Sequence, residues 1–335
     1  MEGAEGELPE SVIAMAEARL RALGDDARRV LRAASVFGER FWSGAVRALL
    51  GAAPARELDA LVAAEVIERS ERSRFAGEDE LAFRHGLLRE AAHAALTPED
   101  RALGHRLAAE WLEEKGEHEA RVVAEHFVAS GAPDRAAPWL LEAARAAFYG
   151  GQFREVARLA ELGIACHPPR ELEGRFWLLA AEACGWGEDV EGSIDTAERA
   201  IETSVTGSSE WFAALSIYTW GAVHALDTER IGRALGLLRG MEGELEAAPP
   251  TGLAVMRAIN SITLLGEREL AADLIERLGR AVDTASEDAR PILEGTGTSR
   301  AETSASSGSK IVARRWREWI APGRASSART TPSVS

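Results

Sequence analysis

The feature that most constrains the fold is a repeated pair of amphipathic helices over about residues 117–284. Its clearest copy, residues 133–165, reads PDRAAPWLLEAARAAFYGGQFREVARLAELGIA and joins its two helices at Gly150-Gly151. Similar joins recur at residues 185–191, 225–230 and 264–270. One pair cannot bury its apolar face alone, so successive pairs are expected to stack into a solenoid. The spacing is typical of tetratricopeptide-like (TPR-like) units of about 34 residues with slightly longer loops. The alternative, a single large helical bundle, would not need periodic joins of small residues.

A different pattern precedes the repeats. Hydrophobic spacing predicts helices over residues 9–24, 26–37, 42–50 and 55–65. Residues 65–75 then partly alternate between apolar and polar, the turn GEDE follows, and residues 81–85 resume the alternation, which predicts a two-stranded hairpin. Helices followed by one hairpin are typical of a winged helix. A helix over about 86–96 is expected next, and Thr97 and Pro98 mark the start of the following helix.

Together these patterns predict an all-α fold, in which a winged-helix module with a small β-hairpin is followed by a TPR-like α-solenoid. The expected domains are residues 1–97, winged-helix-like with an N-terminal helix, and residues 98–285, the helical repeats. Residues 286–335 are expected to be a disordered or non-native low-complexity tail, because their Gly-, Ser- and Thr-rich sequence buries too little apolar surface to offset the entropy of ordering. Within this tail, residues 310–321 (KIVARRWREWIA) are a candidate basic helix for a membrane surface or a partner.

The charge of the chain opposes binding to nucleic acid. The formal net charge is −15, whereas a protein that neutralises phosphates needs a basic face. The N-terminal sequence is acidic and has no apolar core of a signal peptide, and no apolar run reaches the ~18 residues of a transmembrane helix. Cys166 and Cys184 form no disulfide framework and have no metal-ligand spacing. These features favour a cytoplasmic protein.

No catalytic motif is found. A P-loop places its Lys directly after Gly, but Lys115 lies in EEKGE and Lys310 in SGSKI. His118 and His126 lie about two helical turns apart, roughly 11 Å, which is too far for one metal ion. Cys166 has only the adjacent His167 as an activating base, and a buried helical Cys is the simpler interpretation. We therefore expect no enzymatic activity, no metal site and no cofactor of the chain's own.

Three segments carry a resemblance to a known family. They are residues 8–23 (LPESVIAMAEARLRAL), 28–42 (RRVLRAASVFGERFW) and 83–117 (FRHGLLREAAHAALTPEDRALGHRLAAEWLEEKGE). This region resembles the part of bacterial STAND-type signalling ATPases that follows the ATPase module, in regulators that include kinase-fused forms and the maltose-regulon activator. In that family a P-loop module precedes a winged helix and TPR-like repeats. The resemblance implies that this chain is the winged-helix and sensor portion without its P-loop module.

The resemblance also singles out His85. Residues 84–92, RHGLLREAA, are similar to the winged-helix motif of plant immune and apoptotic ATPases, whose His reaches the β-phosphate of bound ADP. Those proteins usually have Asp at the position of Gly86. The resemblance implies that His85 senses a nucleotide held by an ATPase module on another chain. The alternative is a structural His whose ring bonds a backbone carbonyl at the end of the wing.

Three functional hypotheses follow. The first is a regulatory scaffold that docks a protein partner, either an ATPase or kinase module or a peptide in the solenoid groove, or senses a small effector. The second is a winged-helix DNA-binding regulator, although the helix at 55–66 has one Arg and three acidic residues. The third is an enzyme with an unrecognised site. Most Trp residues of the repeats are expected in the core, and Trp186, beside two Gly residues, is expected to be partly exposed.

Overall fold

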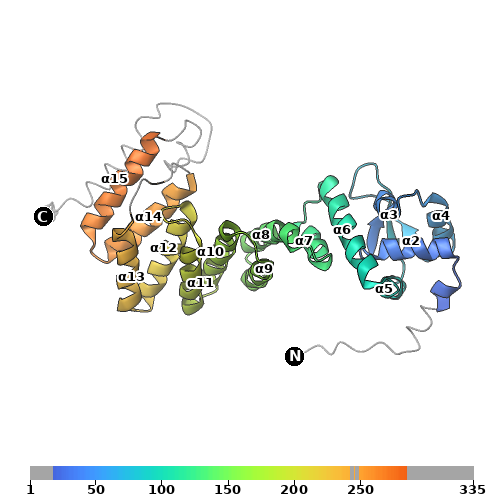
Figure 1. The fold of residues 1–335 in the computed structure, drawn as a ribbon, viewed down its shortest axis with the longest axis horizontal. Coiled ribbons are helices and arrows are strands. Elements are labelled where there is room, and N and C mark those ends of the chain that lie inside the picture. Colours follow the sequence, from blue (N-terminus) through green and yellow to red (C-terminus); the bar gives the residue numbers. More distant parts are fainter. Residues whose placement is uncertain (1–17, 242–244, 246–248, 285–335) are drawn as a thin grey trace, which may run out of the picture. The chain divides into compact units, whose positions relative to one another are not determined.

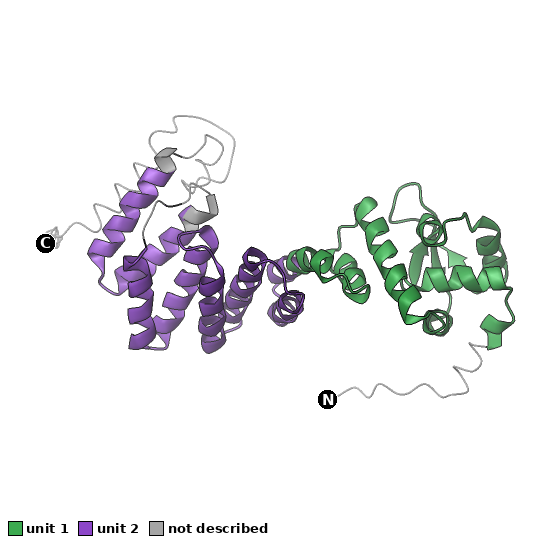
Figure 2. Cartoon of the chain, in the orientation of Figure 1, with its two compact units in different colours: residues 1–143 green, residues 144–335 purple. Residues whose placement is uncertain are grey.

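The computed structural model describes residues 18–241, 245 and 249–284, which form two compact units, unit 1 up to residue 143 and unit 2 from residue 144 (Figures 1 and 2). The described part is predominantly helical with one small antiparallel sheet, so the predicted all-α class with a small β-hairpin is confirmed. The candidate helix at 310–321, like the rest of the predicted tail, lies outside the described residues.

The first part of unit 1 is the module that the sequence predicts as a winged helix. Residues 18–21 are helical and precede the first complete elements. These elements are α2 (Asp25–Ser35), β1 (Arg40–Trp42), α3 (Ser43–Leu50), α4 (Ala55–Ala63), β2 (Ile67–Arg69), β3 (Glu80–Phe83) and α5 (Gly86–Ala94). The strands are antiparallel in the order β1-β3-β2. The predicted hairpin, β2 and β3, is present, and β1 adds a third strand that the sequence did not predict.

The short strand β1 pairs along its whole length with β3, with Phe41 opposite Leu81. Three residues are too few to show a period of two, which explains why the pattern missed it. Both side chains are fully buried with Leu31 of α2 and Leu61 of α4 in one apolar cluster. This cluster is the core of the winged-helix module.

Two further helices complete most of unit 1, α6 (Pro98–Glu114) and α7 (Ala120–Ala129). The hydroxyl of Thr97 accepts a hydrogen bond from the Asp100 backbone N–H at 3.1 Å, so the predicted N-cap of α6 is confirmed. Trp111 of α6 stacks on Trp42 with ring centroids 5.5 Å apart. The contacts thus group α6 and α7 with the winged-helix module in one unit, and the sequence-based limits at 97 and 285 stay predictions.

Unit 2 consists of helical hairpins. The helices are α9 (Phe153–Ala165), α10 (Arg170–Trp186), α11 (Val190–Thr203), α12 (Ser209–His224), α13 (Thr228–Arg239), α14 (Pro249–Leu264) and α15 (Arg268–Thr284), and α8 (Pro133–Tyr149) leads into them. The first helices of successive pairs begin at residues 133, 170, 209 and 249, which are 37, 39 and 40 residues apart. This regular succession is α-solenoid-like, and we call α8, α10, α12 and α14 the A helices and their partners the B helices.

Each A helix ends at the same kind of turn. A residue with left-handed backbone conformation follows it: Gly151, Glu188, Leu226 and Gly266 have φ of 70°, 65°, 55° and 84°. Two of the four are not glycine, and the join at residues 225–230 has no glycine at all to mark its turn in the sequence.

Candidate functional site

The predicted site residue His85 lies between β3 and α5. It occupies the N-cap position of α5 with extended backbone (φ −138°, ψ 121°), and its side chain is exposed. Its ring makes no hydrogen bond to any residue of the described part of the chain, a backbone carbonyl included. The preceding Arg84 forms ion pairs with Glu65 at 3.4 Å and Glu68 at 3.3 Å. The imidazole of His85 is therefore presented to solvent and is free to meet a group from another molecule.

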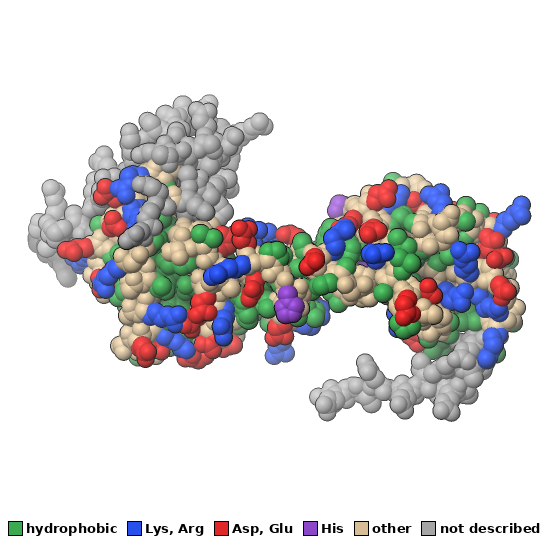
Figure 3. All heavy atoms as spheres, in the orientation of Figure 1, with side chains coloured by type: hydrophobic (Ala, Val, Ile, Leu, Met, Phe, Trp, Pro, Cys, Tyr) green, Lys and Arg blue, Asp and Glu red, His purple; other side chains and the backbone are tan. Residues whose placement is uncertain are grey.

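The surface expected for DNA contact is balanced in charge. Arg69 of β2 pairs with Asp59 of α4 at 2.6 Å and with Asp79 at 3.2 Å. Figure 3 shows acidic and basic side chains interspersed over the face in view of both units. An arginine that is paired with carboxylates is less available to neutralise the charge of a phosphate. This charge pattern therefore disfavours the DNA-binding hypothesis.

A pocket of about 910 Å³ opens on unit 1 between the loop that joins β2 to β3, strand β1, and the adjoining ends of α6 and α7. Its lining is Phe37, Glu39, Arg40, Trp42, Arg72, Ser73, Arg74, Glu80, Leu112, Glu117, Arg121, Val122 and His126. Four arginines and three glutamates therefore lie around apolar and aromatic side chains. No local sequence pattern predicts this pocket, because its residues come from segments up to 89 positions apart.

Two buried carboxylates, Glu80 and Glu117, connect the segments that line the pocket. Glu80 accepts hydrogen bonds from Arg40 at 2.8 Å and from the Arg74 backbone N–H at 2.9 Å. Burial raises the pKa of the Glu80 carboxyl, but these hydrogen bonds and the charge of Arg40 outweigh it and hold the pKa below its usual range. Glu117, whose side chain is 1% exposed, pairs with Arg74 at 2.5 Å and accepts a hydrogen bond from the Glu119 backbone N–H at 2.8 Å. The loop of the wing is thereby braced against the ends of α6 and α7.

Three histidines from α5, α6 and α7 lie close together, and one of them, His126, lines this pocket. The Nδ1 atoms of His105 and His126 are 2.8 Å apart, and the ring of His93 lies 5.7 Å from that of His105. Burial, with His93 and Arg101 as weaker causes, lowers the pKa of His105 to about 4. Burial and His105 lower the pKa of His126 to about 4 as well. Both rings are neutral at pH 7, so one can donate a hydrogen bond to the other. No local sequence pattern predicts this contact, because the three rings come from separate helices.

Neither a metal site nor a reactive cysteine is supported by the side chains of the described residues. No group of three or more His, Cys, Asp or Glu side chains there is placed to hold a metal ion. Neither Cys166 nor Cys184 is in a disulfide, and burial raises the pKa of the Cys184 thiol, which disfavours its nucleophilic thiolate. None of the helices in these residues combines the length and apolarity that a bilayer-spanning helix needs.

Unit 2 presents a face built from its A helices. Arg175 of α10 pairs with Glu210 of α12 at 3.1 Å, and Arg257 of α14 lies 3.5 Å from Glu182 of α10. These ion pairs join three A helices on one side. We define the A-helix face by Leu178, Glu182, Trp186, Ile217, Trp220, Arg257 and Leu264. Burial raises the pKa of the Glu182 carboxyl although Arg257 opposes this effect, so the ion pair lies in a partly desolvated setting.

Aromatic and aliphatic side chains on this face are open to solvent. Trp186 is 67% exposed, Trp220 42% and Leu264 83%. The partial exposure predicted for Trp186 is confirmed. Trp220 is not among the Trp residues that lie in the core, because its side of α12 lies opposite the buried Tyr218 and Leu215. Trp220 instead packs against His224 in a tilted arrangement, with ring centroids 4.1 Å apart. Large exposed apolar side chains at corresponding helices are typical of a binding surface.

Comparison with known proteins gives no match: no protein-family model, no curated protein and no solved structure is similar to this chain.

Proposed function

We propose that this chain is a regulatory and interaction scaffold, the winged-helix and TPR-like sensor portion of a STAND-type signalling ATPase. It works with an ATPase or kinase module supplied by another polypeptide or segment, in the cytoplasm, and performs no catalysis and holds no cofactor of its own. Its partner is a protein, and nucleic acid is a much weaker candidate.

The observation that carries this proposal is the A-helix face of unit 2. Stacked hairpins hold Trp186, Trp220 and Leu264 in open positions, with the Glu182–Arg257 ion pair beside them. The occupant of this face is an apolar peptide segment of the partner. Its side chains bury against the exposed rings, and its polar groups meet the flanking charges, which is how helical arrays recognise peptides.

The exposed His85 supports the second half of the proposal. A side chain with no partner in the described residues, held at the junction of β3 and α5, is free to reach a phosphate on a docked ATPase module. A neutral or protonated imidazole donates a charge-assisted hydrogen bond to a phosphate oxygen. His85 acts in trans in this proposal, because the chain lacks the Gly-Lys-Ser/Thr of a P-loop.

Selection of peptides from a displayed random library on the purified full chain tests the docking proposal. We expect enriched peptides with two or more apolar anchor residues. Their affinity should fall about tenfold or more in the Trp186→Glu and Trp220→Glu variants, because buried aromatic anchors dominate such interfaces. Leu162→Glu is the matched control, since this 37% exposed side chain lies on α9, a B helix.

Failure of the library to enrich any peptide contradicts the proposal. So does an enriched peptide whose affinity is lowered as much by Leu162→Glu as by the two Trp variants. Circular dichroism of each variant separates lost binding from lost folding.

A further inference from the structure

The pocket of unit 1 has the properties of a small-molecule site. Its volume of about 910 Å³ lies within the range of roughly 300–1,000 Å³ that is common for ligand pockets. It has an apolar wall, formed by Phe37, Trp42, Leu112 and Val122, and a charged rim. We infer that this pocket binds a small organic anion, a carboxylate or a phosphate ester, that also carries a hydroxyl or amino donor.

The arginines of the rim define the anionic part of the ligand. Arg72 is exposed and makes no ion pair or hydrogen bond to any described residue. Arg121 is half exposed and forms one ion pair, between its Nε and Glu125 at 3.7 Å. Arg40, 70% exposed, uses one nitrogen for Glu80. Each guanidinium has five N–H donors in a planar fork that matches carboxylate and phosphate oxygens. Most of these N–H donors make no hydrogen bond within the described part of the chain. They are therefore available to an anion that accepts two hydrogen bonds from one guanidinium.

Glu117 defines the second part of the ligand. Its side chain is 1% exposed, and Oε1 accepts the hydrogen bonds already described. Its Oε2 is buried and has no hydrogen-bond partner among the described residues. A buried carboxylate oxygen without a donor is costly. An O–H or N–H group of a bound ligand supplies the missing donor.

The floor of the pocket fits the carbon skeleton of such a ligand. Trp42 is 7% exposed, and its buried indole N–H lacks a hydrogen-bond partner at normal geometry although it faces the Glu80 carboxylate. The aromatic and aliphatic wall offers apolar surface on which the carbon skeleton of a ligand can be buried.

A purely structural role explains only part of this arrangement. Bracing the wing against α6 and α7 accounts for the pairs Arg40–Glu80 and Arg74–Glu117. It does not account for the unused donors of Arg72 and Arg121, nor for the unpaired oxygen of Glu117. These are the groups that a ligand would use.

Calorimetry on the full chain at low ionic strength tests this inference with inorganic phosphate, succinate and L-malate as probes. We expect saturable binding of at least one anion. The affinity should fall about tenfold or more in the double variant Arg72→Gln/Arg121→Gln, because charge-assisted bidentate hydrogen bonds are lost. The double variant Arg56→Gln/Arg106→Gln is the control: it makes the same change of charge at exposed positions outside the pocket lining and should bind as the original chain does.

Binding of phosphate alone identifies a phosphate ester as the ligand class, and binding of the dicarboxylates identifies an organic acid. L-Malate should bind more tightly than succinate, because only malate has a hydroxyl for Glu117, and Glu117→Gln should reduce this difference. The inference is overturned if none of the three anions binds saturably, or if the pocket and control double variants bind equally.

Discussion

At the residue scale, the glycines of unit 2 have opposite roles. Gly151 ends α8 with φ of 70°, whereas Gly236 lies inside α13, and a Cβ atom would meet nothing within 4 Å at either position. The same substitution should therefore change stability in opposite directions. Gly151→Ala strains the left-handed backbone and should lower the free energy of unfolding by about 1 kcal/mol. Gly236→Ala should raise it by roughly 0.5–1 kcal/mol, because Ala favours a helix interior.

Chemical denaturation of both variants measures this difference. Equal signs would show that the turn after α8 does not hold the backbone conformation described above.

The buried histidines make stability depend on pH. The pKa of His126 is about 4 in the folded chain, below the roughly 6.5 of an unfolded His. The unfolded state therefore binds more protons between these values, and the free energy of unfolding falls as the pH drops from about 6.5 toward 4. The loss between pH 7 and pH 5 is on the order of 1–2 kcal/mol for this 7% exposed side chain.

Unfolding of the original chain and of His126→Gln at pH 7 and pH 5 checks this prediction. The variant should lose less stability on acidification than the original chain. An equal loss would mean that His126 is protonated alike in both states.

At the scale of elements, close helix packing depends on small residues. A Cβ atom on Gly163 of α9 would lie 2.1 Å from the ring of Phe176 on α10, and Phe176 is fully buried. Gly163→Ala should therefore lower the free energy of unfolding by about 1–3 kcal/mol, the usual cost of overpacking. Gly236→Ala, which has open space, is the control. A Gly163→Ala variant as stable as the original chain would show that α9 and α10 are not in such close contact.

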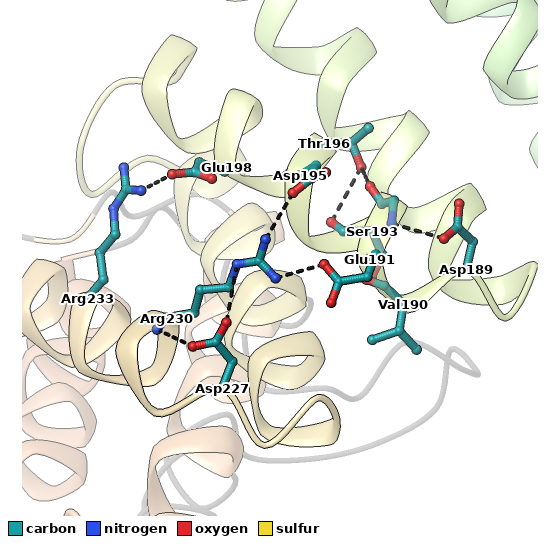
Figure 4. A network of polar contacts seen from close by, with 11 residues as sticks. Asp189, Val190, Glu191, Ser193, Asp195, Thr196, Glu198, Asp227, Arg230 and Arg233 are labelled. Carbon is teal, nitrogen blue, oxygen red and sulfur yellow. Dashed lines mark hydrogen bonds and ion pairs between the residues drawn. The ribbon is translucent and has the colours of Figure 1, made fainter.

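Successive B helices are joined by charge. Arg230 of α13 forms ion pairs with Glu191 at 2.8 Å and Asp195 at 3.2 Å on α11, and with Asp227, the N-cap residue of α13, at 3.6 Å (Figure 4). Arg233 pairs in the same way with Glu198. The acidic residues of α11 thus act as structural partners of α13.

Arg230→Gln should lower the free energy of unfolding by about 1 kcal/mol at low salt, because a network of three carboxylates loses its cation. The effect should shrink in 1 M NaCl, where the screening length is only about 3 Å. Arg199→Gln removes one exposed pair, with Glu202 at 3.5 Å, and should change stability by less than about 0.5 kcal/mol. A salt-independent effect of Arg230→Gln would contradict the electrostatic explanation.

At the scale of the whole molecule, the sequence predicted what local pattern determines. The helices of the hairpins, the N-cap at Thr97 and the strands of the wing all follow from periodicity and from residues within a few positions of one another. Strand β1 was missed because it is short and is held by distant pairing with β3. The pocket and the pair His105–His126 depend on side chains from separate segments of the chain, so no local sequence pattern predicts them.

The candidate sites follow the same division. His85 was singled out by a resemblance, and its exposed position at the N-cap of α5 leaves the ring accessible to another molecule. The A-helix face required knowledge of which side of α12 is buried, and a single Trp in a mostly apolar helix does not show this by itself.

Hydroxyl-radical footprinting with a peptide selected on the full chain tests the central claim, that unit 2 docks a partner through its A helices. Oxidation of Trp186, Trp220 and Leu264 should fall when the peptide is bound, because their exposed surfaces become covered. Leu162 and Val205, which are 37% and 65% exposed outside this face, should be oxidised as before. Unchanged oxidation of the two Trp residues, or protection confined to Leu162 and Val205, would contradict the account.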